Sequence, residues 1–134
     1  MNDQLRSDLI AYKMRAAKDL LPEIKSHIDN GFYNTAMNRM YYACFNAATA
    51  LLIAEKVPEV KRHSTVRNLF NRQFVKTGRF DAKWGNFYSE IMDCRAAADY
   101  EDFKIYTHAE AAEMYPHVCE FVALAEDELN KINL

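Results

Sequence analysis

The most apolar stretch of the chain covers residues 34–54 and carries a single charged side chain, Arg39. Its apolar residues fall on two adjacent stripes at helical spacing, containing Met37, Met40 and Cys44, and Tyr41, Phe45 and Ala48, respectively. A helix that is apolar on most sides lies inside a protein, where other helices surround it. The pattern therefore predicts a central helix over residues 34–54.

A third line along this helix is polar but almost uncharged. It consists of Thr35, Arg39, Tyr42, Asn46 and Thr49. Such side chains are unusual on a solvated face and suit either a buried polar seam or an interface. We therefore expect functional residues along this line.

Amphipathic spacing predicts further helices at residues 3–30, 64–75, 82–98 and 107–132. Gly31 and Gly78 supply stops, while Asp81 and the pair Thr107 and Glu110 supply N-terminal caps. Prolines at positions 22 and 116 predict kinks, and residues 98–103 (ADYEDF) are expected to form an acidic turn. The chain is thus predicted to be all-α, an antiparallel four-helix bundle with an additional short helix, in one domain over residues 1–134.

Composition narrows the class of protein. The net charge of −2 argues against a strongly basic nucleic-acid scavenger, although it permits a local basic patch. The odd number of dispersed cysteines favours reduced core residues, and residues 1–9 lack the pattern of a signal peptide. The stretch 34–54 contains too many Asn, Thr and Tyr residues for a membrane span. We expect a cytoplasmic protein with no membrane association.

Arg95 is the most informative charged residue after Arg39, because it shares a stripe with apolar side chains of the fourth predicted helix. An arginine in that position is costly unless it is paired or faces a groove. Asp99, one turn later, is a candidate partner. A structural Arg–Asp salt bridge and a functional site both fit this spacing.

His63 and Arg67 lie in the clearest local concentration of positive charge, at the start of the third predicted helix. This segment suits either a phosphate site or a solvated basic loop. The acidic side of the last helix, which includes Glu113 and His117, lacks the Glu-x-x-His pairs of a di-iron bundle. We also find no Gly-rich phosphate loop, and we expect neither a metal nor a cofactor.

Three segments together resemble the HEPN family, the "higher eukaryotes and prokaryotes nucleotide-binding" domain. They are GFYNTAMNRMYYACFNAATALL, with Asn38, Arg39, Tyr41 and Tyr42; KRHSTVRNLFNRQFVKTG; and CRAAADYEDF, with Arg95, Asp99 and Tyr100. The resemblance covers almost the whole chain and implies a helical bundle that often dimerises around a shared cleft. Many members look like toxin components encoded beside a nucleotidyltransferase of the MNT type.

Several members of the family are metal-independent RNases with an Arg-x(4–6)-His motif, in which the arginine steadies the phosphate and the histidine assists proton transfer. Here Asp99 and Tyr100 follow Arg95, and the positions that four to six intervening residues would leave for the histidine hold Tyr100, Glu101 and Asp102. The expected histidine is therefore absent from its place. His63 is the candidate to replace it across the bundle or across a dimer.

Three hypotheses follow for a cleft lined by Arg39, Tyr42, His63, Arg67, Arg95 and Tyr100. The first is a homodimeric, toxin-like RNA-directed protein with a nucleotidyltransferase partner, in which Arg95, Asp99 and His63 are catalytic. The second is a nucleotide-binding or adaptor subunit that performs no chemistry. In the third, Arg39 and Arg95 only satisfy a buried polar seam.

Overall fold

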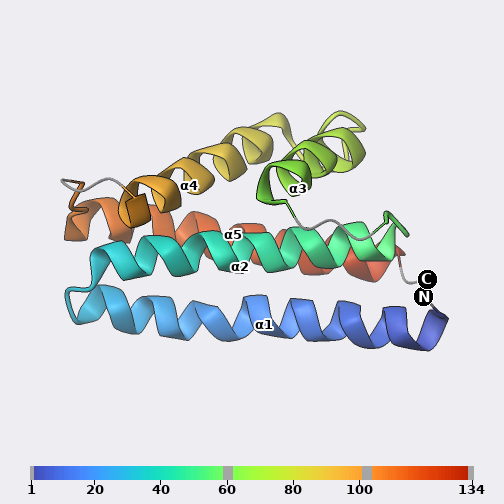
Figure 1. Ribbon diagram of the computed structural model, residues 1–134, viewed down its shortest axis with the longest axis horizontal. Helices are drawn as coiled ribbons and strands as arrows, with labels where there is room; N and C mark the ends of the chain where they lie inside the picture. The colour runs from blue at the N-terminus through green and yellow to red at the C-terminus, as the bar shows by residue number, and fades with distance from the viewer. Residues whose placement is uncertain (1, 59–61, 101–103, 133–134) are drawn as a thin grey trace.

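The computed structural model describes residues 2–58, 62–100 and 104–132, and it is helical almost throughout (Figure 1). The long helices are α1 (Asp3–Asp29), α2 (Tyr33–Ala54), α4 (Ala82–Tyr100) and α5 (His108–Ile132). The short helix α3 (His63–Phe70) leads directly into a π-helix, η1 (Asn71–Val75). This arrangement confirms the all-α bundle of four long helices with an additional short one.

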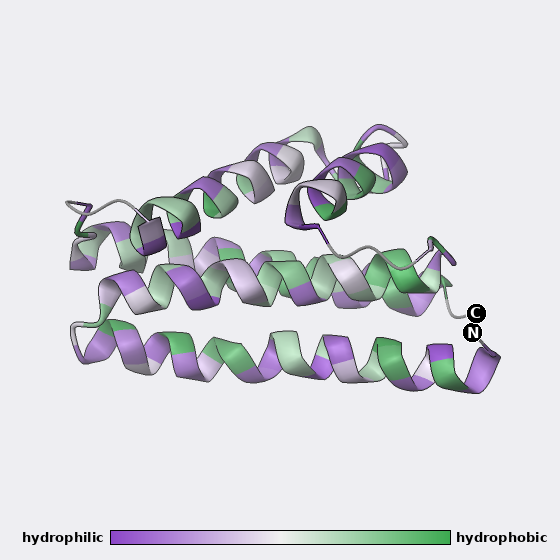
Figure 2. Ribbon diagram, in the orientation of Figure 1, coloured by the Kyte–Doolittle hydropathy of each residue, from purple (hydrophilic) through white to green (hydrophobic). Residues whose placement is uncertain are grey.

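Helix α2 is the centre of the bundle, as its apolar pattern predicts. It packs against α1, α4, α5 and α3, and Figure 2 shows it as the more apolar neighbour of the banded helix α1. Its buried side chains include many alanines, which allow neighbouring helices to approach closely. They are Ala36, Met37, Met40, Tyr41, Ala43, Cys44, Ala47, Ala48, Ala50, Leu51 and Leu52.

The predicted helix ends are present. At the end of α1, Gly31 adopts a φ of 83° and the Phe32 amide donates to the carbonyl of His27 at 2.8 Å. At the start of α5, the Thr107 amide donates to Glu110 at 3.0 Å, and the Glu110 amide donates to the Thr107 hydroxyl at 3.2 Å. These bonds form the capping box that the sequence indicates.

Two predicted boundaries are wrong. The third helix does not remain an α-helix to residue 75, because the Lys76 amide bonds to the carbonyl of Asn71 across the π-helix. Helix α4 continues through Tyr100, where an acidic turn was expected, because Arg95 and a side chain of α2 both hold Asp99. The remainder of that expected turn lies outside the described residues.

Neither proline interrupts its helix, since α1 is continuous through Pro22 and α5 through Pro116. All three cysteines are free; Cys44 is buried and the other two are half-buried. Within the described residues, no helix is sufficiently long and apolar to cross a membrane.

Candidate functional site

Arg95 lies near the end of α4 and makes contacts with both α4 and α2. Its Nε is 3.1 Å from the Asp99 carboxylate, and one terminal nitrogen donates to the hydroxyls of Tyr42 at 3.3 Å and Tyr100 at 3.4 Å. Asn38 of α2 donates to the same Asp99 carboxylate at 2.8 Å. The predicted Arg95–Asp99 pair is therefore present, and it is tied to the central helix.

Aromatic rings enclose the Arg95 guanidinium. Its carbon lies 5.5 Å from the ring centroid of Tyr41, 5.6 Å from that of Tyr42 and 5.4 Å from that of Tyr100. Ring faces attract a cation, most strongly where water is excluded. Only 17% of the Arg95 side chain is exposed, whereas Tyr100 is 71% exposed. The guanidinium is thus mostly buried among these rings, of which Tyr100 is the exposed one, and we call Arg95 and the three rings the aromatic cleft.

His63, the first residue of α3, is held against the same aromatic group. Its Nδ1 is 2.6 Å from the Tyr41 hydroxyl, and its ring stacks on Phe45 at 4.5 Å and 15°. Burial, and secondly the positive charge of Arg95, lowers the pKa of His63 below its ordinary value of 6.5. Burial raises the pKa of Tyr41 to about 12, so that both rings are neutral at pH 7.

The structure brings Arg95 and His63 together although they are 32 positions apart in the chain. Tyr41 and Tyr42 connect them, because each ring contacts both the guanidinium and the imidazole. The three elements involved are α2, α3 and α4. A cation and a titratable imidazole in one cleft form a combination suited to binding a phosphodiester and moving a proton beside it.

The other predicted residues lie farther from this centre. Arg39 is 43% exposed, approaches Glu23 of α1 at 3.9 Å and donates to Asn38 at 3.3 Å, so that it reaches Asp99 only through Asn38. Arg67 lies one turn after His63 on α3 and is half-buried. Burial raises the pKa of Tyr88, a neighbour of Tyr41, and the positive charge of Arg67 opposes this rise.

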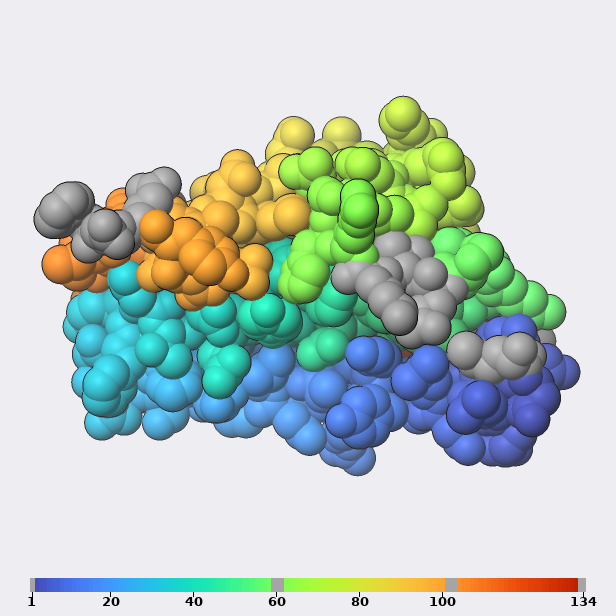
Figure 3. Space-filling model, in the orientation of Figure 1, coloured from blue at the N-terminus to red at the C-terminus, as the bar shows by residue number. Residues whose placement is uncertain are grey.

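The polar line along α2 is not a buried seam. Thr35 is exposed, and Arg39, Tyr42, Asn46 and Thr49 are all partly exposed. Figure 3 shows the same feature at the surface, where side chains of α2 remain visible as a strip between α1 and the α3–α4 layer. The line is therefore one wall of an open face.

Sequence reasoning did not assign site roles to Asn38, Tyr41 and Phe45. Asn38 orients Asp99, Tyr41 bonds to His63, and Phe45 supports the imidazole ring. Tyr41 and Phe45 occur on an apolar stripe, which indicates core, and nothing in that pattern shows that a histidine from α3 reaches them. The NRMYY segment was the available signal, since it places Asn38, Tyr41 and Tyr42 next to Arg39.

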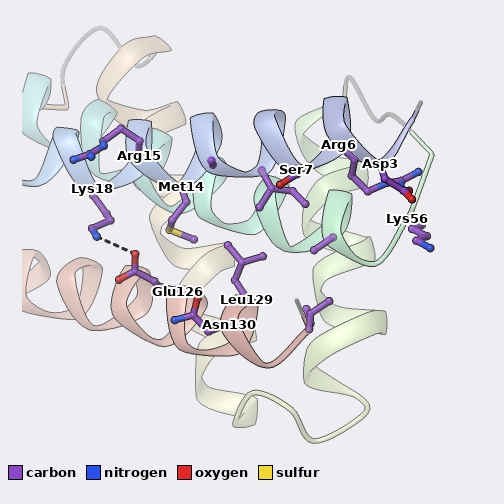
Figure 4. Close-up of a pocket in the computed structure, with 14 residues that line it drawn as sticks. Asp3, Arg6, Ser7, Met14, Arg15, Lys18, Lys56, Glu126, Leu129 and Asn130 are labelled. Carbon is purple, nitrogen blue, oxygen red and sulfur yellow. Dashed lines mark hydrogen bonds and ion pairs between the residues drawn. The ribbon is translucent and has the colours of Figure 1, made fainter. Parts of the chain in front are cut away.

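A groove with a volume of about 840 Å³ lies elsewhere, between α1 and α5. Figure 4 shows Lys18 and Glu126 pointing toward each other across it, and their charged atoms are 2.9 Å apart. None of the residues around Arg95 lines this groove. The described residues also contain no group of three or more His, Cys, Asp or Glu side chains placed to hold a metal ion.

Comparisons with known proteins identify the family of the chain. A family model of the HEPN domain matches residues 10–128, and the chain therefore belongs to the HEPN domain family. A protein of Thermotoga maritima named "UPF0332 protein" is 37% identical over 95 residues, which cover 71% of each chain.

Two proteins of Methanocaldococcus jannaschii are also similar, and each is named "Putative toxin". One is 35% identical over 86 residues, covering 64% of this chain and 57% of that protein. The other is 30% identical over 100 residues, covering 75% of this chain and 73% of that protein. The chain is thus similar to HEPN proteins whose names place them in the toxin class.

Proposed function

We propose that this chain is an RNA-directed, toxin-type HEPN protein and a component of a toxin–antitoxin-like module. The observation that carries the proposal is the meeting of Arg95 and His63 in one cleft, where both contact Tyr41 and Tyr42. Arg95 binds a phosphate of the RNA, and His63 takes the place of the histidine that is missing after Arg95. The names of the two archaeal relatives support the toxin class.

The chemistry is a metal-independent cleavage in which the ribose 2′-hydroxyl is the nucleophile. Its oxygen bonds to phosphorus while the bond from phosphorus to the 5′-oxygen breaks, and the leaving 5′-oxygen takes a proton from water in place of the one lost by the 2′-hydroxyl. Arg95 offsets charge on the phosphate oxygens. His63 accepts the first proton at Nε2 when its Nδ1–H donates to Tyr41. Asp99 keeps the guanidinium in position.

The remaining residues of the cleft extend the binding surface. Tyr100 offers an exposed ring on which a base can stack, and Arg39 and Arg67 supply positive charge on either side. We propose that a second copy of the chain completes the cleft, as a homodimer in the cytoplasm. A nucleotidyltransferase of the MNT type is the proposed partner of the module.

A second function, a non-catalytic nucleotide-binding or adaptor subunit, has its own support. The guanidinium of Arg95 already has a carboxylate and two hydroxyls of this chain around it, so that a phosphate must compete with them. Asn38 holds the carboxylate in place and strengthens that competition. In this alternative the protein binds RNA or a nucleotide and leaves it intact.

The test is incubation of the purified protein with labelled total RNA, with and without EDTA. Arg95→Ala and His63→Ala are the test variants, and Arg72→Ala is the control because Arg72 is exposed and lies outside the cleft. Cleavage that survives EDTA and disappears in both test variants supports the RNase function. Binding without cleavage by the folded protein favours the adaptor, and neither binding nor cleavage rejects both.

The partner requires a separate experiment. The chain is co-expressed with the MNT-type nucleotidyltransferase encoded nearest to it, and the complex is analysed by size-exclusion chromatography with light scattering. Co-elution in a defined ratio supports the module. Separate elution of a dimer of this chain removes the nucleotidyltransferase from the proposal and leaves the dimer.

A further inference from the structure

A groove of about 570 Å³ lies along the second half of α2. Its walls come from the first half of α1, the second half of α2 and the start of α3, and they include Leu9, Phe45, Ile53, Pro58 and Val66. Phe45 belongs to both places, because its ring stacks on His63 while it also lines the groove. The groove therefore begins at a residue that also contacts His63 of the Arg95–His63 site.

The charged residues that line this groove are basic. Among the described residues, its lining includes Arg6, Lys13 and Lys56 and no carboxylate. Arg6 is paired with Asp3 at 2.8 Å, whereas neither lysine forms an ion pair in the part of the chain that the structure describes. The groove between α4 and α5 has a similar volume but carries four glutamates along its lining. The two grooves thus differ in the charge of their linings, which the net charge of −2 does not reveal.

The floor of the basic groove suits flat, partly polar groups. Most of its lining side chains are aliphatic or aromatic, and Thr49 is a polar residue among them. Sites that bind single-stranded nucleic acid combine a basic groove for the backbone with aromatic side chains, such as Phe45 here, on which bases stack. The groove has both components.

Lys56 occupies a position at which glycine is the less strained residue. Its φ is 61°, in the left-handed region, and the neighbouring Val57 amide closes the end of α2 by donating to the carbonyl of Leu52 at 3.1 Å. A lysine in this conformation has a strained backbone, and strained residues are common at ligand-binding sites. The strained backbone places an exposed cation at the rim of the groove.

We propose that the ligand is a single RNA strand several nucleotides long, which runs from Arg95 and His63 along α2 into this groove. This inference rests on the proposed function and deepens it, because it selects an RNA strand over a free nucleotide. From Tyr42 to Ala54, α2 rises about 18 Å, or about five nucleotides at the ~3.4 Å spacing of a stacked strand. The bases lie on the apolar floor, and Lys13 and Lys56 hold phosphates.

The test compares a long and a short ligand on one charge-reversed variant. The double variant Lys13→Glu/Lys56→Glu is titrated with a labelled 12-nucleotide single-stranded RNA by fluorescence anisotropy, and with a dinucleotide by amide chemical-shift changes. We expect at least tenfold weaker binding of the 12-nucleotide RNA and a change of less than twofold for the dinucleotide. Lys76→Glu is the matched control, because Lys76 is exposed and lines none of these grooves.

The outcomes separate this inference from the proposed function. If the double variant binds the 12-nucleotide RNA as tightly as the unaltered chain, or if Lys76→Glu weakens it equally, the strand does not use the groove. If Arg95→Ala still weakens binding in that case, the proposed site stands without the groove. If the unaltered chain binds no RNA, both fail. A changed oligomeric state of the double variant on size-exclusion chromatography instead makes the groove an interface between copies and also overturns the inference.

Discussion

Arg79 and Arg95 both lie among carboxylates and aromatic rings, but we expect different roles for them. Arg79 lies 2.6 Å from Glu55, at the end of α2, and 3.2 Å from the buried Glu128 of α5, and its guanidinium lies 4.4 Å from the ring centroid of Phe74. Arg95 has one carboxylate, from its own helix, and three tyrosine rings. Both are cations held by carboxylates and aromatic rings.

The difference lies in what each arginine connects. Arg79 joins α2 to α5 through two carboxylates, so its charge is fully compensated and its removal leaves Glu128 buried without a partner. Arg95 has a single carboxylate and lies beside a histidine in the aromatic cleft, which includes an exposed tyrosine. Arg79 thus has the surroundings of a structural arginine, whereas the surroundings of Arg95 are those of the binding site that we propose.

The largest effect on stability is expected from Arg79→Ala. The substitution leaves the carboxylate of Glu128 with little solvent and no cation, and we expect a loss of about 2–3 kcal/mol in the free energy of unfolding. Urea denaturation followed by circular dichroism measures this loss. Arg72→Ala, an exposed control in the adjacent π-helix, should change stability by less than about 0.5 kcal/mol. Equal values for the two variants would remove the structural role of Arg79.

Arg95→Ala should give the reverse pattern. We expect a loss of stability of about 1 kcal/mol, because Asp99 remains 25% exposed and water can solvate it, together with at least tenfold weaker RNA binding. Denaturation and fluorescence anisotropy on the same preparation measure the two quantities. If the variant binds RNA normally but is destabilised as much as Arg79→Ala, then Arg95 has a structural role and not a binding role.

His63 provides a pH-dependent test of the same cleft. Because its pKa in the folded protein is below 6.5, the unfolded chain binds its proton first, and the stability that neutral His63 contributes is complete above pH 6.5 and is lost as the pH falls toward the folded pKa. Arg95→Ala should raise the pKa of His63, since the positive charge of Arg95 is one cause of the shift. Imidazole ¹⁵N chemical shifts, recorded from pH 4 to pH 8, measure this value. An unchanged pKa in the variant would show that the two groups do not interact.

The smallest effect is expected from Lys56→Gly. This substitution tests whether RNA binding is the reason that a lysine occupies a left-handed backbone position. Glycine relieves the left-handed conformation, and stability should stay the same or rise by up to about 1 kcal/mol, while binding of a 12-nucleotide RNA weakens severalfold. Thermal denaturation and anisotropy measure the two changes. Lower stability together with unchanged binding would show that the lysine is retained for packing.

The sequence predicted the bundle well because its signals are local. The apolar stretch from 34 to 54, Gly31 and the pair Thr107 and Glu110 each act within a few turns of helix, and each is present in the structure. The two wrong boundaries, at the π-helix and at the end of α4, occur where tertiary contacts intervene. Gly85 illustrates this, since a Cβ there would lie only 2.6 Å from Asn71 Oδ1 of the π-helix.

The candidate site was only partly predictable. Spacing indicated the Arg95–Asp99 pair, because both residues lie on one face of one helix. It gave no indication that His63 bonds to Tyr41, or that Asn38 links Asp99 to Arg39, since these contacts join different helices. No sequence pattern indicated a role for Arg79, because both of its carboxylate partners are far away in the chain.

The sequence by itself determined that the chain is an all-α bundle around one apolar helix, and its motifs indicated the HEPN family. These conclusions depend on periodicity, caps and short motifs, which a chain carries before it folds. Only the tertiary structure decided which charges meet. It joined Arg95 to His63, paired Arg79 with Glu128 and gathered Lys13 and Lys56 on one groove. The physical reason is that electrostatic and aromatic contacts act over a few ångströms in space, and sequence distance does not specify that separation.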